Sequence, residues 1–322
     1  MSKNKTSLLI GATGFIGQNL ANYLQTHGEK VVGTYVHKVR TQDFNPGVRL
    51  VYCDVTKPKN IERVVRKWHP NYIYYLAAQS SVREAWLHPA ETIQINFLGG
   101  VFLLETLRNL KSNARVLIFS SGMTYGASYL SGKSLNEEAC LKPMDPYSIS
   151  KMGIDFSARL YARTYGLPVS IVRLANLTGA RQSIAFSIAN FASQIAEIET
   201  GKRSSTIKVG NLSAVRDYLD IRDGIPAIHL AMKHGRAGEA YNIASGNSRA
   251  LKDVLEQLIE LSSLARREIK IKKKDTLIPK DEITAVKLDP SKFKKLTGWK
   301  PQIPFRKTLK DILNQWRRKI KN

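Results

Sequence analysis

Short runs rich in apolar residues recur along the first half of the chain, and apolar residues at helical spacing follow several of them. These runs cover residues 7–10, 31–35, 48–52, 72–75, 116–119 and 169–173. Such short apolar runs are typical of strands that are buried on both faces. Their alternation with helices predicts an α/β fold with a doubly wound parallel sheet, whose ligand lies at the carboxyl ends of the strands.

The second half of the chain has a less regular pattern. Helices are predicted over 184–198, 221–234, 251–264 and 308–321, and short strands at 207–209 and 240–243. No flexible linker or internal repeat separates the halves. We expect a larger domain over 1–175, with later returns near 215–245, and a smaller α/β domain formed by 176–214 and 246–322.

A glycine-rich segment, 11–17, lies between the first predicted strand and a helix on which Ile16, Leu20 and Leu24 recur. Its first glycine permits a tight turn, the second lets backbone approach a pyrophosphate, and the third lets helix pack on strand. The helix N-terminus then faces the anion. In this context the segment predicts an NAD(P)-binding Rossmann fold, with cofactor contacts from Gly11, Thr13, Gly14, Phe15 and Ile16.

The end of the second predicted strand favours NADP(H). A site for NAD carries an acidic residue there, which binds the ribose 2′-hydroxyl. Segment 34–40 has no acid and two cations, Lys38 and Arg40, which suit a 2′-phosphate. A plain surface loop is the alternative for these two cations, and NAD stays open as the cofactor.

Two further strand ends are expected beside the cofactor. Asp54 and Val55 follow the third strand, and Asp54 can either accept a hydrogen bond from the adenine amino group or cap its own loop. The fourth strand ends in small residues that let the backbone pass close to a cofactor, and the predicted contacts there are Leu76, Ala77 and Ala78.

The segment Tyr147-Ser148-Ile149-Ser150-Lys151 carries the predicted chemistry. In a helix, Tyr147 and Lys151 share one face, and an ammonium beside a phenol lowers the phenol's pKa towards neutrality. Such a tyrosine can give a proton to a carbonyl oxygen or take one from an alcohol. An amphipathic helix with one exposed lysine is the plain alternative, but the glycine-rich segment and the sequence 120–122 (Ser-Ser-Gly) favour an enzyme.

Composition excludes several protein classes. The chain has 322 residues, 43% of them hydrophobic, but no apolar run reaches the ~18 residues of a membrane span. The N-terminus lacks the features of a secretory signal. Cys53 and Cys140 are too few for a disulfide framework and lack metal-ligand spacing. We therefore expect a reduced, cytoplasmic protein with no membrane partner and no metal.

The net charge of +24 is unusual, but the basic residues are spread along the chain. No zinc-finger, RNA-recognition or helix-turn-helix pattern is present, so no specific nucleic-acid partner is expected. We interpret the charge as a solvated surface that helps to attract an anionic nucleotide substrate. A non-catalytic cofactor-sensing or nucleic-acid-binding protein on the same fold stays open as an alternative.

Four segments together resemble the extended short-chain dehydrogenase/reductase superfamily: GATGFIG at Gly11, LAAQSSV at Leu76, FSSGMTYG at Phe119 and YSISK at Tyr147. Later segments resemble its sugar-nucleotide branch, which contains the GDP-D-rhamnose-forming GDP-6-deoxy-4-keto-D-mannose reductases and the GDP-mannose 4,6-dehydratases. These later segments are 191–199, 207–212, 215–223 and 296–301. The resemblance spans nearly the whole chain and implies that the smaller domain binds the substrate.

The resemblance implies a role for each site residue. Ser121 hydrogen-bonds the sugar oxygen, Tyr147 donates the proton, and Lys151 binds the nicotinamide ribose and lowers the tyrosine's pKa. It also implies substrate contacts from Gln79, Ser80, Asn176, Gln182, Lys208 and Arg216. Of these, Arg216 would hold the diphosphate of the substrate. The plain alternatives are an ion pair of Arg216 with Asp217, a turn at Asn176 and an exposed strand residue at Lys208.

One departure from the family pattern distinguishes between reactions. Dehydratases of this branch carry a glutamate two residues after the position of Ser121, where this chain has Met123. Because a thioether cannot remove the C5 proton, we expect a reductase and not a dehydratase. Two further departures are Leu177, where the reductases usually have a histidine, and Lys280, where a substrate-binding arginine is expected. They leave the identity of the nucleotide base and of the sugar open.

The expected reaction is NADPH-dependent reduction of the C4 ketone of a nucleotide-linked 4-keto-6-deoxyhexose. The expected substrate is GDP-4-keto-6-deoxy-D-mannose, and its product, GDP-D-rhamnose, belongs to polysaccharide biosynthesis. A nucleotide-sugar 4-epimerase with tightly bound NAD is the enzymatic alternative. The helices near 91–110 and 145–165 form a four-helix contact in this family, which implies a homodimer or a dimer of dimers.

Overall fold

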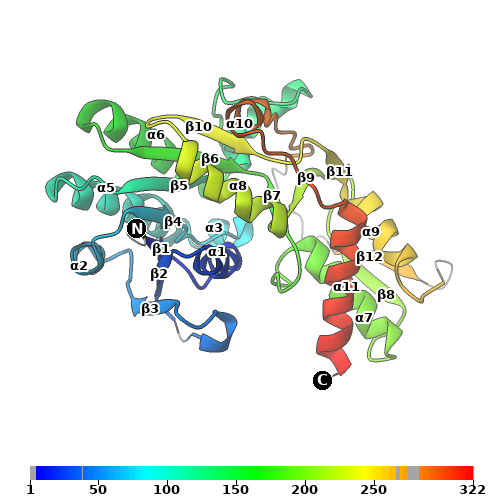
Figure 1. Ribbon diagram of the computed structural model, residues 1–322. Coiled ribbons are helices and arrows are strands. Elements are labelled where there is room, and N and C mark those ends of the chain that lie inside the picture. The colour runs from blue at the N-terminus through cyan, green and yellow to red at the C-terminus, as the bar shows by residue number, and fades with distance from the viewer. Residues whose placement is uncertain (1–4, 38, 266–268, 275–282, 322) are drawn as a thin grey trace.

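A seven-stranded parallel sheet forms the larger part of the computed structural model, which describes residues 5–37, 39–265, 269–274 and 283–321 (Figure 1). Across the sheet the strand order is β10-β6-β5-β4-β1-β2-β3. The chain starts in the middle and winds first to one edge and then to the other, so the predicted doubly wound Rossmann fold is confirmed. The strands are β1 (Thr6–Ile10), β2 (Lys30–Tyr35), β3 (Arg49–Tyr52), β4 (Tyr72–Tyr75), β5 (Arg115–Ser121), β6 (Val169–Leu174) and β10 (Ala240–Ile243).

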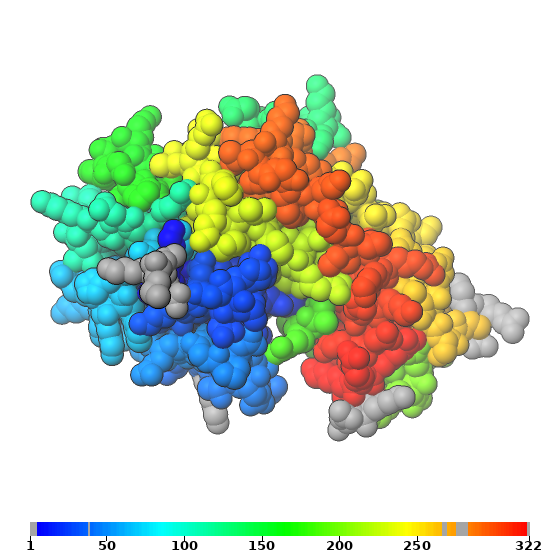
Figure 2. Space-filling model, in the orientation of Figure 1, coloured from blue at the N-terminus to red at the C-terminus, as the bar shows by residue number. Residues whose placement is uncertain are grey.

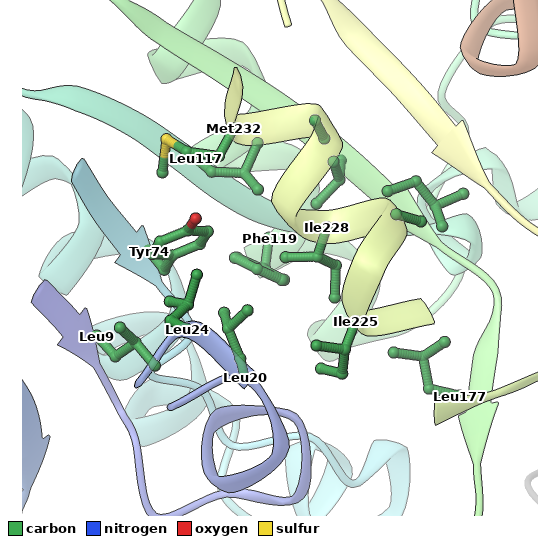
Figure 3. Close-up of a cluster of buried hydrophobic side chains, with 14 of the residues drawn as sticks. Leu9, Leu20, Leu24, Tyr74, Leu117, Phe119, Leu177, Ile225, Ile228 and Met232 are labelled. Atoms are coloured by element: carbon green, nitrogen blue, oxygen red, sulfur yellow. The ribbon is translucent and has the colours of Figure 1, made fainter. Parts of the chain in front are cut away.

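Helices cover both faces of this sheet because its strands alternate apolar side chains between the two faces. Leu9 and Tyr74 pack with α1 (Phe15–Thr26) and α8 (Ile221–His234), as Figure 3 shows. Their neighbours Ile10 and Ile73 point the other way, into a second core. The helices of that second core are α2 (Pro58–Trp68), α5 (Gly99–Asn109) and α6 (Pro146–Tyr165).

A smaller lobe lies beside the sheet, to the right in Figure 1. Its core contains the fully buried Ile195, Leu255 and Leu313. These residues belong to helices that pack with a two-stranded parallel sheet, and the elements are α7 (Ser187–Glu199), α9 (Leu251–Glu260), α11 (Phe305–Lys321), β8 (Thr206–Val209) and β12 (Lys270–Lys273).

A three-stranded sheet joins the two parts, with β9 (Val215–Asp220) between β7 (Asn176–Thr178) and β11 (Ser248–Ala250). β7 begins two residues after β6 ends, and α8 begins on the residue that follows β9. The small lobe therefore continues directly from the large sheet, without a tether.

The segment 283–289 connects two distant parts of the fold. Leu288 bridges to Leu135, and Ala285 bridges to Val215 at the start of β9. The Leu135 amide donates to the Lys287 carbonyl at 3.0 Å. The segment continues into α10 (Ser291–Thr297), whose Phe293 packs on the α8 side of the sheet.

The predicted strands of the large sheet are all present, but the helix predicted over 91–110 is not one regular helix. It consists of α4 (Pro89–Ile93), a π-helical turn η2 (Gln94–Leu98) and α5, and a separate helix α3 (Val82–Leu87) precedes it. The extra residue of the π-helical turn directs Asn96 into the interior. The boundary predicted at 175 falls on the one residue between β6 and β7, and the division into domains stays a prediction.

Candidate active site

The glycine-rich loop after β1 fits tightly against the end of β4. Gly11 has φ +93°, and a Cβ built on it would lie 2.6 Å from the Ala77 amide nitrogen. The Gly11 amide donates to the buried Thr34 hydroxyl at 2.9 Å, which fixes the loop to β2. Gly14, the residue just before α1, has no side chain that could cap the helix. In the described structure no side chain at this N-cap position accepts a hydrogen bond from the first amides of α1. This cradle suits a diphosphate.

The predicted adenosine contacts are placed less completely. Arg40 is exposed in the loop after β2, whereas Lys38 and Lys280 lie outside the described residues. Asp54 Oδ1 accepts hydrogen bonds from the Thr56 amide at 2.9 Å and the Thr56 hydroxyl at 2.7 Å. The loop-capping alternative for Asp54 is therefore present in the structure, and its contact with adenine stays a prediction.

The amino end of α6 is fixed by a capping box. Asp145 accepts from the Ser148 amide at 2.9 Å, and the Ser148 hydroxyl accepts from the Asp145 amide at 3.2 Å. Pro146 follows at the first helical position, where its missing N–H costs nothing. The position of Tyr147, the next residue, is therefore determined by the start of the helix.

The structure brings Ser121, Tyr147 and Lys151 together. Lys151 is 4% exposed, and its Nζ donates to the Phe119 carbonyl at 2.8 Å, which attaches α6 to β5. Ser121 ends β5, and its Oγ accepts from the Met123 amide at 3.1 Å. Ser121 also lies close enough to Tyr147 to affect the pKa of its phenol. A reacting oxygen placed beside this pair meets a hydroxyl and a phenol at once.

The pKa of Tyr147 differs from the predicted value. Burial raises it to about 12, the nearby Ser121 side chain opposes this rise, and the charge of Asp145 adds to it. Lys151 directs its ammonium to a backbone carbonyl, and burial lowers its own pKa to about 8. The expectation that Lys151 lowers the Tyr147 pKa towards neutrality was wrong, because burial is the largest influence on the phenol and the ammonium is directed to the Phe119 carbonyl. Tyr147 therefore stays protonated near pH 7, as a proton donor must be.

The predicted substrate residues divide into an exposed and an internal group. Asn176 on β7, Lys208 on β8 and Ser80 are exposed. Arg216 on β9 is half-buried, and its Nη1 donates to the Val215 carbonyl at 2.9 Å and to the Thr284 carbonyl at 3.3 Å. Figure 2 shows a hollow between the blue N-terminal part and the green and red segments of the small lobe.

The internal group holds the chain in place. Gln79 donates to the Ser81 carbonyl at 2.9 Å and the Thr92 hydroxyl at 3.1 Å. Gln182 is 7% exposed and uses both ends of its amide, on the Thr178 hydroxyl and the Leu177 carbonyl. This structural role was not part of the prediction, and substrate contact by these two glutamines stays a prediction.

Asn96 is a site-supporting residue that the sequence pattern did not reveal. It is fully buried, and its Nδ2 donates to the Gln79 carbonyl at 2.9 Å and to the Ser150 hydroxyl at 3.0 Å. It thereby ties the loop after β4 to α6, next to Lys151. A regular helix would have directed this position differently, so only the π-helical turn reveals its role.

Met123, two residues after Ser121, places a thioether and not a carboxylate at this position. The Met123 side chain is partly buried against an apolar cluster that includes Tyr125 and Leu288. Within the described ranges, no three side chains of His, Cys, Asp or Glu are grouped as metal ligands, and no helix is both long and apolar enough to cross a bilayer.

Comparisons with known proteins agree with this geometry. A family model described as GDP-mannose 4,6 dehydratase matches residues 8–312. A GDP-6-deoxy-D-mannose reductase from Pseudomonas aeruginosa is 28% identical over 312 residues, with 97% of each chain covered. The solved structure of RMD from Pseudomonas aeruginosa complexed with NADPH has a TM-score of 0.83 at 27% identity and covers 98% of this chain and 99% of that one.

A second solved structure resembles the chain equally well in shape. UDP-glucose 4-epimerase from Thermotoga maritima with UDP-glucose has a TM-score of 0.87 at 25% identity, and covers 98% of this chain and 99% of its own. Similarity to both proteins therefore extends over nearly the whole chain. Overall shape alone does not separate a reductase from an epimerase.

Proposed function

Since the chain belongs to the GDP-mannose 4,6-dehydratase family, we propose that it reduces the C4 ketone of a GDP-linked 4-keto-6-deoxyhexose with NADPH. The proposed substrate is GDP-4-keto-6-deoxy-D-mannose and the product is GDP-D-rhamnose. The observation that carries the proposal is the protonated Tyr147 beside Ser121, with Met123 where a dehydratase has its base. The relative named GDP-6-deoxy-D-mannose reductase supports the same reaction.

In the proposed reaction, each residue around the reacting carbon has a separate role. When bound, the nicotinamide supplies the hydride. Tyr147 donates its phenolic proton to the C4 oxygen, and Ser121 orients that oxygen through its hydroxyl. Lys151 presents a buried ammonium that stabilises negative charge on the side of the site where the C4 oxygen reacts.

The residues present fit a dinucleotide cofactor. The close approach of Gly11 to Ala77 leaves a shallow backbone cradle that a larger side chain would fill. The uncapped start of α1 offers amides to the diphosphate, with Thr13 and Ile16 beside it. Arg40 supports NADPH over NADH. The solved NADPH complex of RMD supports this choice, and NAD is the second candidate because a 25% identical dTDP-glucose 4,6-dehydratase from Streptomyces venezuelae was solved with NAD bound.

The second candidate function is a nucleotide-sugar 4-epimerase, and similarity to UDP-glucose 4-epimerase favours it. It would use the same serine, tyrosine and lysine, but it would keep NAD bound and return the hydride to the other face of the sugar. Cofactor status separates the two functions. NAD retained through purification supports an epimerase, whereas net oxidation of added NADPH supports a reductase.

A homodimer is part of the proposal. Exposed apolar side chains lie along α6, with Phe156 50% and Leu160 47% exposed, and Trp86 on α3 is 49% exposed. An exposed apolar surface of this kind suits a second copy of the chain. The proposal also includes a cytoplasmic enzyme whose product serves polysaccharide synthesis.

The test of the proposed function is an assay of the purified protein with NADPH and a panel of 4-keto-6-deoxy sugar nucleotides that differ in base. The expected result is oxidation of NADPH with the GDP-linked substrate and formation of a new C4 hydroxyl. Turnover of only UDP- or dTDP-linked sugars would exclude the GDP assignment. Absence of turnover, combined with salt-sensitive binding to nucleic acid, would favour the non-catalytic alternative.

A further inference from the structure

Arg173 on β6 is a buried charge that the proposed reaction does not use. It is 1% exposed, and it lies in one row of the sheet between Ser120 on β5 and Asn242 on β10. Four of its five N–H groups have protein acceptors. Two go to Asp155, at 2.9 and 3.1 Å, one to the Tyr125 hydroxyl at 2.9 Å, and one to the Glu137 carbonyl at 3.2 Å.

One branch of this guanidinium holds the helix that carries the proton donor. Tyr147, Lys151 and Asp155 are spaced four residues apart on α6 and so follow one side of it. Asp155 is fully buried and receives the bidentate pair from Arg173. The reactive side of α6 is therefore fixed to β6 as well as to β5.

The other branch holds the turn that carries Ser121. Tyr125 follows Ser121 by four residues in the 3₁₀ helix η3 (Gly122–Ser131) and is fully buried. Its hydroxyl accepts from Arg173 and donates to Asn242 Oδ1 at 2.9 Å. Within the same turn, the Thr124 hydroxyl donates to the Ser121 carbonyl at 2.6 Å. The turn is thus anchored to β6 and β10 right after the serine.

We propose that Arg173 is a positioning residue, which sets the separation of the Ser121 hydroxyl and the Tyr147 phenol by binding Asp155 and Tyr125 at the same time. This inference rests on the proposed function, in which that pair meets the C4 oxygen. Simultaneous binding of Asp155 and Tyr125 requires the planar guanidinium of an arginine, because a lysine ammonium cannot make the same set of directed hydrogen bonds. A buried ion pair is by itself weak evidence for a stabilising role, since replacement of such a pair by apolar packing is often neutral.

Two variants interrupt the network, and a third is a matched control. Tyr125→Phe removes one hydroxyl and keeps the ring, and Arg173→Lys keeps the charge and loses the fork. Arg159→Ala is the control, because Arg159 also binds Asp155, at 3.0 Å, but its side chain is 35% exposed and makes no hydrogen bond to η3 in the described structure. It removes one bond from the same carboxylate and leaves the link to Ser121 intact.

The expected result is a fall in kcat of about 10- to 100-fold for both network variants, because small misplacements of reacting groups have effects of this size. Their KM values for NADPH and the nucleotide sugar should stay within about threefold, since binding surfaces are unchanged. The deuterium isotope effect with 4-deuterated NADPH should rise, because the chemical step becomes slower than product release. Arg159→Ala should match the parent protein. All measurements are made below each variant's melting transition.

A purely structural role predicts a different outcome. If Tyr125→Phe and Arg173→Lys lower the melting temperature but keep kcat within about twofold, Arg173 is not a positioning residue. If Arg173→Lys does not fold, Tyr125→Phe still decides the question. Crystal structures of the parent and Tyr125→Phe proteins give a readout without turnover: an unchanged separation of Ser121 Oγ and Tyr147 Oη would overturn the inference, even if no sugar nucleotide is a substrate.

Discussion

The proposed reaction centre and the proposed substrate-binding surface are built in opposite ways. Ser121 and Lys151 are almost fully buried, and their polar atoms are held by backbone groups of β5 and η3. Asn176 and Lys208 are instead exposed, on the short strands β7 of the joining sheet and β8 of the small lobe. The fold itself therefore sets the geometry of the proposed chemistry, whereas the residues proposed for substrate recognition are exposed.

The largest expected effect is at the buried centre. Tyr147→Phe removes the proton donor, so turnover should fall by about 10³-fold, the range of general acid catalysis. Binding of NADPH, followed by its fluorescence, should stay nearly intact because the ring remains. Turnover within tenfold of the parent would remove Tyr147 from the mechanism and leave the buried centre without its assigned acid.

The cofactor cradle should be nearly as sensitive. Gly11→Ala places a Cβ 2.6 Å from backbone, so the loop must shift, and we expect NADPH affinity to fall by about 100-fold. Gly28→Ala is the matched control, because Gly28 also has a positive φ, +78°, but has nothing within 4 Å of the added Cβ. It should lose only about 1 kcal/mol of stability and keep its affinity. Equal affinities for the two variants would contradict the predicted diphosphate site.

A smaller effect is expected on the substrate-facing surface. Arg216→Ala should raise the KM for the nucleotide sugar by about 30-fold, the value of one charged hydrogen bond, and leave kcat within about threefold. Lys310→Ala, an exposed cation on α11, is the control for a loss of surface charge. A lower kcat with an unchanged KM would mean that Arg216 acts on the reaction and not on recognition.

The smallest effect comes from pH. Since burial lowers the pKa of Lys151 to about 8, its ammonium is lost as pH rises, and kcat/KM should fall about tenfold between pH 7 and pH 9. The free energy of unfolding should instead rise with pH. The folded protein binds fewer protons at Lys151 than the unfolded chain between about pH 8 and the usual value of 10.5, so this residue adds stability as pH rises through that window.

Parallel rate and melting profiles from pH 7 to 9 separate the two effects. The Lys151→Met protein should lack the alkaline fall in rate relative to its own value at pH 7. If the fall persists in that variant, the titrating group lies elsewhere in the site.

The large sheet was predictable because its signals are local. The glycine-rich loop and the apolar runs of β1, β4 and β5 are each contained within a few residues. The strands β7 and β11 are three residues long, and Val215 in β9 pairs with Ala285, seventy positions later. Since such pairings depend on the folded chain, no window of sequence contains them.

The sequence predicted which residues of the candidate site share a helix face, but it did not predict the pKa of the tyrosine. The spacing of Tyr147 and Lys151 correctly indicated one helix face. The direction of the tyrosine's pKa depends on how deeply the phenol is buried and where the lysine points, which spacing does not report. The inward position of Asn96 depends on one extra residue in a helical turn.

The uninterrupted passage from β6 into β7, and from β9 into α8, has a practical consequence. A recombinant fragment that ended at residue 175 would keep α1 but lack α8 and β10, and would expose the side chains that pack towards α8, among them Tyr74 and Phe119. Exchange of all residues after 175 between related enzymes would therefore replace α8 and β10 of the large sheet together with the small lobe. New sugar preferences must be engineered by replacing individual side chains in place.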